Sequence, residues 1–272
     1  MLPNVIYVYD GAWNAELRLD EVVGYLREKT GTRVTKRDDP LGPFAGSTGE
    51  RLRGMALERC AMRIRAITNQ NWDMTPLPGE IAYEKKTILD PGKRIPGILY
   101  DGFRLREFYY NLILEQERTS EFLHLIVTNE MFGTWDRNDR RYHARTSIYS
   151  FPSIISVPGL VDAPAKPREY YLKRQLGLHA EILREEYSGY LHKDDDRLTE
   201  VLKGYSMQAL FFHLTGEPFC DDRNCRLFNA HRQEELIQAQ LKEGKEFCEK
   251  HEAMIGDFRS QISARRLKIE DS

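Results

Sequence analysis

The sequence lacks any apolar run long enough to cross a membrane, which would need about 20 consecutive apolar residues. It also lacks an excess of either charge, because 40 basic and 42 acidic side chains leave a formal net charge of -2 over 272 residues. A chain this close to neutral has no overall field that would draw it to nucleic acid or to an anionic membrane. Residues 1–10 carry neither the basic start nor the cleavage site of a signal peptide. We therefore expect a cytoplasmic protein with no nucleic-acid or membrane partner.

Cysteine is scarce as well, with four residues in the chain, and these are unevenly distributed. Cys60 lies in a segment of helical composition and is interpreted as core packing. The other three lie near the C-terminal end, where Cys220 and Cys225 flank a polar loop and Cys248 precedes His251 by three residues. Residues three apart share one face of a helix, so Cys248 and His251 can reach the same ion.

This spacing predicts one structural Zn²⁺ per chain, held by Cys220, Cys225, Cys248 and His251. Closed tetrahedral sites with three thiolates and one imidazole are common structural zinc sites. Two alternatives remain open, namely a disulfide between Cys220 and Cys225, and a set of unrelated cysteines beside a surface histidine. A disulfide is disfavoured in the reducing cytosol that we expect for this chain.

The first third of the chain has a strand–helix–strand pattern. β-Branched and aromatic residues predict a strand over 4–10, followed by a helix over 21–29 and a second strand over 33–36. Asp20 is expected to cap the helix and Gly31 to end it. Because a helix connects the two strands, the pattern favours a parallel sheet.

The rest of the chain alternates between helical and extended segments. Strands are predicted over 97–100, 122–128, 146–150 and 152–157, and helices over 50–68, 103–114, 168–192, 198–215 and 233–268. Irregular structure is predicted over 69–79 and 135–145. His124, inside a strand, is interpreted as a satisfied core histidine. We expect an α/β fold with a mixed sheet and packed helices. Residues 1–195 would form the sheet core. Residues 196–272 would form a helical segment held together by the zinc ion, within the same compact domain.

The stretch from 209 to 225, ALFFHLTGEPFCDDRNC, resembles the zinc-protease signature of the archaemetzincins, H-E-x-x-H-x-x-G-x-x-H-C-x4-C, which is followed by C-x-x-C. The matching positions are His213 for the second histidine, Gly216 for the glycine, and Cys220, Cys225 and Cys248 for cysteines. Most of the chain also resembles a prokaryotic metallopeptidase family, through residues 141–145, 152–156, 163–171 and 226–237. The resemblance implies a metzincin-like fold.

Three departures from the signature concern its chemistry. Ala209, Leu210 and Phe219 stand at the first zinc-ligand histidine, the general-base glutamate and the third histidine. A metzincin holds its zinc with three histidines, and its glutamate takes a proton from the bound water. The resemblance therefore implies a relative of zinc metallopeptidases whose catalytic site is degraded, with hydrolytic activity unproven.

The catalytic candidates that remain are His213 and Glu217. A rebuilt metal site would have to add His143 and His231, with Glu217 or Glu234 as the base. His213 also has a simpler interpretation, because a histidine in the last turn of a helix can bond to a backbone carbonyl group.

A second functional hypothesis comes from the charged segment 135–145. The residues that could grip a carboxylate or phosphate are Arg140, Arg141, His143 and Arg145. In metzincins an edge strand above the cleft binds extended substrate by strand addition, so by analogy this segment would form the rim of a cleft. The chain would then be a non-catalytic protein that holds a peptide or a small anion. The alternative is a solvated loop whose arginines pair with Asp136 and Asp139.

Overall fold

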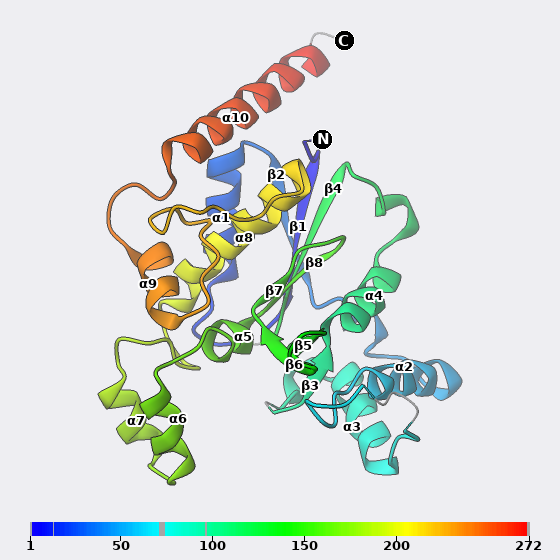
Figure 1. Ribbon diagram of the computed structural model, residues 1–272. Helices are drawn as coiled ribbons and strands as arrows, with labels where there is room; N and C mark the ends of the chain where they lie inside the picture. Colours follow the sequence, from blue (N-terminus) through cyan, green and yellow to red (C-terminus); the bar gives the residue numbers. More distant parts are fainter. Residues whose placement is uncertain (1, 13, 71–73, 96, 271–272) are drawn as a thin grey trace.

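The computed structural model describes residues 2–12, 14–70, 74–95 and 97–270. Figure 1 shows a central five-stranded sheet with helices on both faces and a smaller three-stranded sheet below it. The strand order of the central sheet is β2 (Arg33–Asp38), β1 (Val5–Gly11), β4 (Phe122–Thr128), β8 (Ser153–Ser156) and β7 (Ser147–Ile148). Neighbouring strands are parallel, except that β7 lies antiparallel at one edge. The predicted mixed α/β fold is confirmed.

The chain enters this sheet through the predicted parallel unit, in which α1 (Leu19–Thr30) connects β1 to β2. Gly31 ends the helix at a φ of 69°, a left-handed conformation that favours glycine. The predicted cap at Asp20 is wrong, because the helix begins one residue earlier, at the buried Leu19. Asp20 instead pairs with Lys36 of β2, at 2.7 Å.

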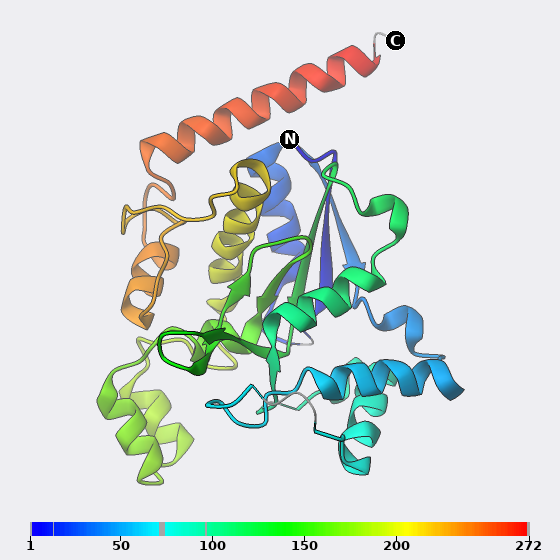
Figure 2. The ribbon, with the colours of Figure 1, turned by 45° about the vertical axis from the view of Figure 1, so that its right-hand side comes forward.

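Alternation along the central strands sends side chains into two cores. On one face Ile6 and Val8 pack with α1 and with α8 (Leu198–Thr215). On the other face Tyr9 and Ile126 pack with α4 (Gly102–Leu112). Figure 2 shows α1 and α8 together on one face of the sheet and α4 on the other. Since burying one large apolar side chain contributes about 1.5–3 kcal/mol, the buried row along α8 fixes this helix against the sheet.

The smaller sheet shows that the prediction of irregular structure over 135–145 is wrong. Its strands are β3 (Leu99–Asp101), β5 (Met131–Asp136) and β6 (Arg141–Arg145), with β5 and β6 paired as an antiparallel hairpin. Buried side chains, among them Phe132 and Tyr142, occur along β5 and β6, but the charged residues between them make this strand pattern hard to recognise in the sequence. Gly133 permits the close pairing, because a Cβ atom there would lie 2.8 Å from the carbonyl oxygen of His143.

The helix predicted over 50–68 is shorter than expected. As α2 (Gly49–Ala61) it stops where the chain turns toward β3. Arg63 forms an isolated bridge with Tyr100, and the Asp101 N–H donates to the carbonyl of Met62 at 2.7 Å. Backbone pairing with β3 therefore replaces the next helical turn.

A further helix, α3 (Pro78–Leu89), was not predicted. It joins α2 through a fully buried ion pair between Arg59 and Glu84, at 2.8 Å. Arg59 also pairs with Glu130, which follows β4. Residues 71–73 of the predicted irregular stretch 69–79 lie outside the described residues.

The strand predicted over 122–128 coincides with β4, and those over 97–100, 146–150 and 152–157 correspond to β3, β7 and β8. His124 is buried in β4, as predicted. The Tyr9 hydroxyl lies 2.9 Å from its Nδ1, and the carbonyl oxygen of Glu117 lies 3.2 Å from its Nε2. Both ring nitrogens of this core histidine therefore have partners.

Two predicted C-terminal helices are each divided. The first is α6 (Arg168–Gln175) and α7 (Ala180–Glu186), with Gly177 at a φ of 81° between them. The second is α9 (Gln233–Leu241) and α10 (Glu249–Glu270), with Gly244 at a φ of 94° between them. The remaining helices are α5 (Val157–Asp162) and the 3-10 helices η1 (Gly42–Phe44), η2 (Pro91–Lys93) and η3 (Glu115–Glu117).

In the part of the chain that the structure describes, no helix has both the length and the apolar character to span a membrane.

Candidate metal centre and neighbouring groove

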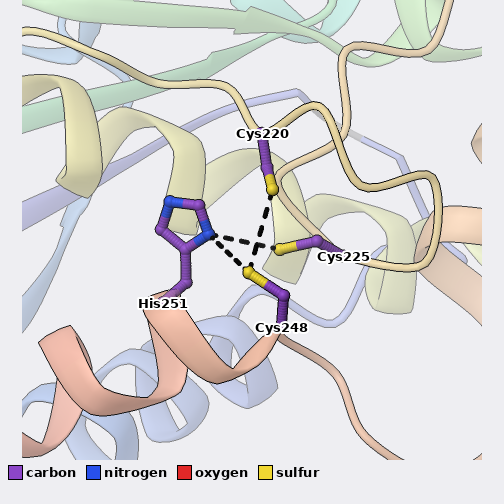
Figure 3. A group of neighbouring side chains, drawn as sticks. All are labelled: Cys220, Cys225, Cys248 and His251. Atoms are coloured by element: carbon purple, nitrogen blue, oxygen red, sulfur yellow. Dashed lines mark hydrogen bonds between the residues drawn. The ribbon is translucent and has the colours of Figure 1, made fainter.

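Three thiols and one imidazole converge between the loop after α8 and the start of α10 (Figure 3). The ligand atoms of Cys220, Cys225, Cys248 and His251 all lie within 4.8 Å of one another. The distance from Cys220 Sγ to Cys248 Sγ is 3.8 Å. His251 Nδ1 lies 3.6 Å from Cys225 Sγ and 3.1 Å from Cys248 Sγ. The structure thus brings together the four residues that the spacing predicts as metal ligands.

Local backbone structure places the first two cysteines. α8 ends at Gly216, which has a φ of 79°, and Pro218 cannot continue a helix. The chain therefore turns into the loop that carries Cys220 and Cys225. In this loop the Asp222 N–H points to Cys220 Sγ at 3.4 Å, and the Cys225 N–H donates to the Asp222 carbonyl at 2.9 Å.

The other two ligands belong to the start of α10. Cys248 directly precedes this helix, and His251 lies in its first turn. The His251 ring packs edge-on against Phe211 of α8, with 5.1 Å between the ring centroids. The four residues therefore connect the end of α8 to the beginning of α10.

The arrangement fits a tetrahedral metal ion. Zinc–sulfur bonds of about 2.3 Å place two sulfurs about 3.8 Å apart at the corners of a tetrahedron, which matches Cys220 and Cys248. Four protein ligands would complete the coordination, so water or substrate would have no open position. All four cysteines of the chain are free thiols, and the alternative disulfide between Cys220 and Cys225 is absent.

The electrostatics of the group also fit a cation. Burial raises the pKa of the Cys225 thiol to about 12 and raises that of Cys220. Burial, together with the charge of Lys250, lowers the pKa of His251. Burial therefore disfavours the charged forms of Cys220, Cys225 and His251. A divalent ion changes this, because a coordinated thiol is deprotonated, and a set of three sulfurs and one imidazole suits Zn²⁺.

The residues at the catalytic positions of the archaemetzincin signature contribute no ligand to this group. Ala209 and Leu210 are buried in the core, at 0% and 2% exposure. His213 Nε2 donates to the carbonyl oxygen of Ser120 at 3.0 Å, which is the simpler interpretation given above. Burial lowers the pKa of His213, which favours the neutral imidazole. Phe219 is 41% exposed.

The other candidates for a rebuilt metal site do not meet. Within the described ranges, the Cys3His group is the only set of three or more Cys, His, Asp or Glu side chains placed to share an ion. His143 pairs with Asp139 at 2.9 Å, His231 lies on the groove described next, and Glu217 is exposed beyond α8. Glu234 accepts a hydrogen bond from the Tyr190 hydroxyl at 2.6 Å.

A groove of about 400 Å³ lies beside the edge strand β7. Residues 145–149 line it, together with Gln208 and Phe212 of α8 and Phe219 of the following loop. The Tyr149 hydroxyl donates to Gln208 Oε1, and the Tyr149 ring lies 5.8 Å from that of Phe219. Sequence reasoning missed Tyr149 and Gln208. The available signal was a glutamine inside an otherwise apolar helical turn.

Among the four residues predicted to grip an anion, Arg145 alone lines the groove in the part of the chain described. It is the last residue of β6 and half-buried, and its Nε donates to Thr134 Oγ1 at 2.8 Å. Arg140 and Arg141 are exposed at the turn of the hairpin, and His143 is engaged with Asp139. Of the four residues predicted to bind an anion, the hairpin therefore brings only the guanidinium of Arg145 to the groove.

Comparison with protein families shows that residues 2–258 match the model described as Probable metallopeptidase family (DUF6775). No curated protein matches the sequence. The chain is also similar to the crystal structure of archaemetzincin from Methanopyrus kandleri, with 14% identity, a TM-score of 0.44, and coverage of 94% of this chain and 95% of that one. A zinc-dependent peptidase from Methanocorpusculum labreanum matches with 12% identity, a TM-score of 0.40, and coverage of 92% and 99%.

Proposed function

The chain belongs to the probable metallopeptidase family, and we propose that it is a member that keeps one structural zinc ion and binds peptides without hydrolysing them. The family predicted from the sequence is confirmed by this membership. The proposal assigns the Cys3His group to the structural ion and the groove beside β7 to the peptide.

One observation carries the proposal: the described residues bring together the ligands of one closed site and of no second site. A hydrolytic zinc needs three protein ligands, an open position for water and a nearby carboxylate as base. The signature positions offer the hydrocarbon side chains of Ala209 and Leu210 and the ring of Phe219 instead. A lone imidazole at His213, already bonded to a carbonyl oxygen, would not hold a metal ion.

Peptide binding is supported by the edge of the central sheet. Within the described residues, β7 pairs with β8 on one side and has no strand on the other. An edge strand offers unpaired backbone N–H and C=O groups, to which an extended peptide can pair as an added strand. The groove follows residues 145–149, and its volume lies in the range of ligand sites.

The metal content of the full chain tests the first part. Elemental analysis of protein purified without a metal-binding tag should give one zinc per chain. Replacing His213 with alanine should leave that value at one, because the proposal assigns this imidazole no metal. Two zinc ions in the wild type, with one lost in His213→Ala, would show that a catalytic ion is present. No zinc in fresh, reduced protein would remove the structural ion from the proposal.

A randomised hexapeptide pool tests the second part. Immobilised wild-type chain should retain peptides from the pool, and mass spectrometry should recover them intact after prolonged incubation. Cleavage that grows with time and stops on addition of a chelator would contradict the absence of hydrolysis. The mixture without the chain serves as the control for spontaneous degradation.

A further inference from the structure

The groove beside β7 carries one permanent charge. Among the described residues that line it there is no aspartate, glutamate or lysine, and Arg145 is its only guanidinium. Apart from His231, the other side chains on its lining are aromatic, aliphatic, hydroxyl or amide groups. A single cation in a neutral groove attracts a single anion, and no carboxylate of the groove itself competes for it.

Arg145 lies where it can receive that anion. Its Nε is fixed by Thr134 Oγ1 at 2.8 Å, and no carboxylate in the described part of the chain forms an ion pair with it. The more deeply buried Arg59 and Arg94, in contrast, pair with carboxylates of the chain itself. The charge of Arg145 acts on Asp136, but the two form no ion pair. Because an arginine binds a carboxylate through two parallel N–H bonds, a half-buried guanidinium that forms no ion pair within the chain is suited to a carboxylate from a ligand.

Beyond Arg145 the groove is aromatic. Tyr149 lies 6.4 Å from Phe212 and 5.8 Å from Phe219, measured between ring centroids. Tyr149 is held in place through its bond to Gln208, whose Nε2 also donates to a backbone carbonyl at 3.2 Å. Phe219 remains 41% exposed, so part of a large apolar ring is open to solvent. A ligand that covers this ring would gain apolar burial without first reorganising the groove.

We propose that this groove binds a peptide through a carboxylate on Arg145 and a large apolar side chain among the rings of Tyr149, Phe212 and Phe219. The inference rests on the proposed peptide binding and names the class of peptide. Arg145 and Tyr149 are four residues apart, which is at most about 13 Å of extended chain. The carboxylate and the apolar side chain therefore belong to one short segment of the ligand, and the carboxylate is either the C-terminus or an acidic side chain.

The test compares two randomised hexapeptide pools, one with free C-terminal carboxylates and one with C-terminal amides. Both pools are offered in competition to the immobilised full chain, and the retained peptides are counted by mass spectrometry. Charge-assisted bidentate bonds are among the strongest hydrogen bonds in proteins, so peptides that carry a carboxylate should be retained at least about tenfold better, which corresponds to about 1.4 kcal/mol. If the C-terminus supplies the carboxylate, the free-acid pool is enriched. If a side chain supplies it, both pools are enriched in Asp or Glu.

Variants separate Arg145 from the rest of the hairpin. Arg145→Met keeps the aliphatic part of the side chain and removes the charge, so it should abolish the enrichment for carboxylates. Arg145→Lys should keep part of it. Arg141→Met is the matched control, because Arg141 belongs to the same strand, is exposed and does not line the groove. It should retain peptides as the wild type does.

Three outcomes overturn the inference. Equal retention of amides and free acids, with no enrichment in acidic residues, would show that no carboxylate is recognised, although peptide binding would stand. Enrichment that survives in Arg145→Met would assign the carboxylate to another residue. If neither pool is retained by the wild type, the proposed peptide binding fails together with the inference.

Discussion

Replacing Cys225 with serine should release the metal ion and detach α10. Cys225 is fully buried, and its sulfur is one corner of the group at the start of this helix. Structural zinc sites contribute on the order of 10 kcal/mol of apparent binding free energy. Among the apolar residues of α10, Ile255 and Ile262 are buried and together contribute about 3–6 kcal/mol, and the partly buried Met254 and Phe258 add to this. The ion therefore accounts for the larger part of what holds α10, and its loss should lower the free energy of unfolding by several kcal/mol.

The assay measures zinc content and urea unfolding on the same samples. Cys225→Ser should contain no zinc and should match the wild type treated with a chelator. Cys60→Ala is the control, because Cys60 is equally buried but lies outside the group. It should keep its zinc and lose only about 1 kcal/mol, since a single buried atom is removed. A metal-free Cys225→Ser protein that unfolds at the same urea concentration as the wild type would refute the reasoning.

Two further predictions concern buried groups away from the metal. Burial lowers the pKa of His124 to about 4, so the folded chain favours the neutral imidazole. The stability that depends on this neutral form is present above pH 6.5 and is lost as the pH falls toward 4, by at most about 3 kcal/mol. The difference in unfolding free energy between the wild type and His124→Gln should therefore change between pH 7 and 4, whereas a constant difference would contradict this. Arg59→Met should cost about 3 kcal/mol in urea unfolding, because it removes the fully buried cation that pairs with both Glu84 and Glu130 and leaves each carboxylate with one remaining arginine partner, Arg63 or Arg94. The exposed Arg65→Met should cost less than about 1 kcal/mol, and equal costs would rule out the buried ion pair as the cause.

The Cys3His group could be predicted because each pair of its residues is close in sequence and has a simple local geometry. Cys248 and His251 are three residues apart at the start of a helix, and Cys220 and Cys225 flank one loop. The sequence does not show that the two pairs face each other, but only one tertiary contact was needed to bring them together. The predicted parallel unit at the start of the chain depends in the same way on local pattern, because Gly31 and two β-branched strands define it.

Charged residues obscure the pattern of the elements that were missed. The face of α3 that contacts α2 carries Glu84, which is buried against Arg59, so its pattern does not show an apolar stripe. The β5–β6 hairpin likewise presents Arg141 and Arg145 around the buried Tyr142. A periodicity argument assumes that buried means apolar, and it fails where ion pairs inside the fold replace apolar contacts.

The signature on α8 shows a different limit, because a motif fixes residue types and not the direction of side chains. In the resemblance, positions 209 and 213 would face one ion, but Ala209 is buried in the core and His213 reaches the loop before β4. The α8 residues that line the groove are Tyr205, Gln208 and Phe212, which are spaced three and four residues apart on one face of the helix. His213 connects the last turn of α8 to Ser120 through its hydrogen bond, a structural role that needs no metal. A single matching histidine is therefore weak evidence for a catalytic ion, because the fold already has another use for it.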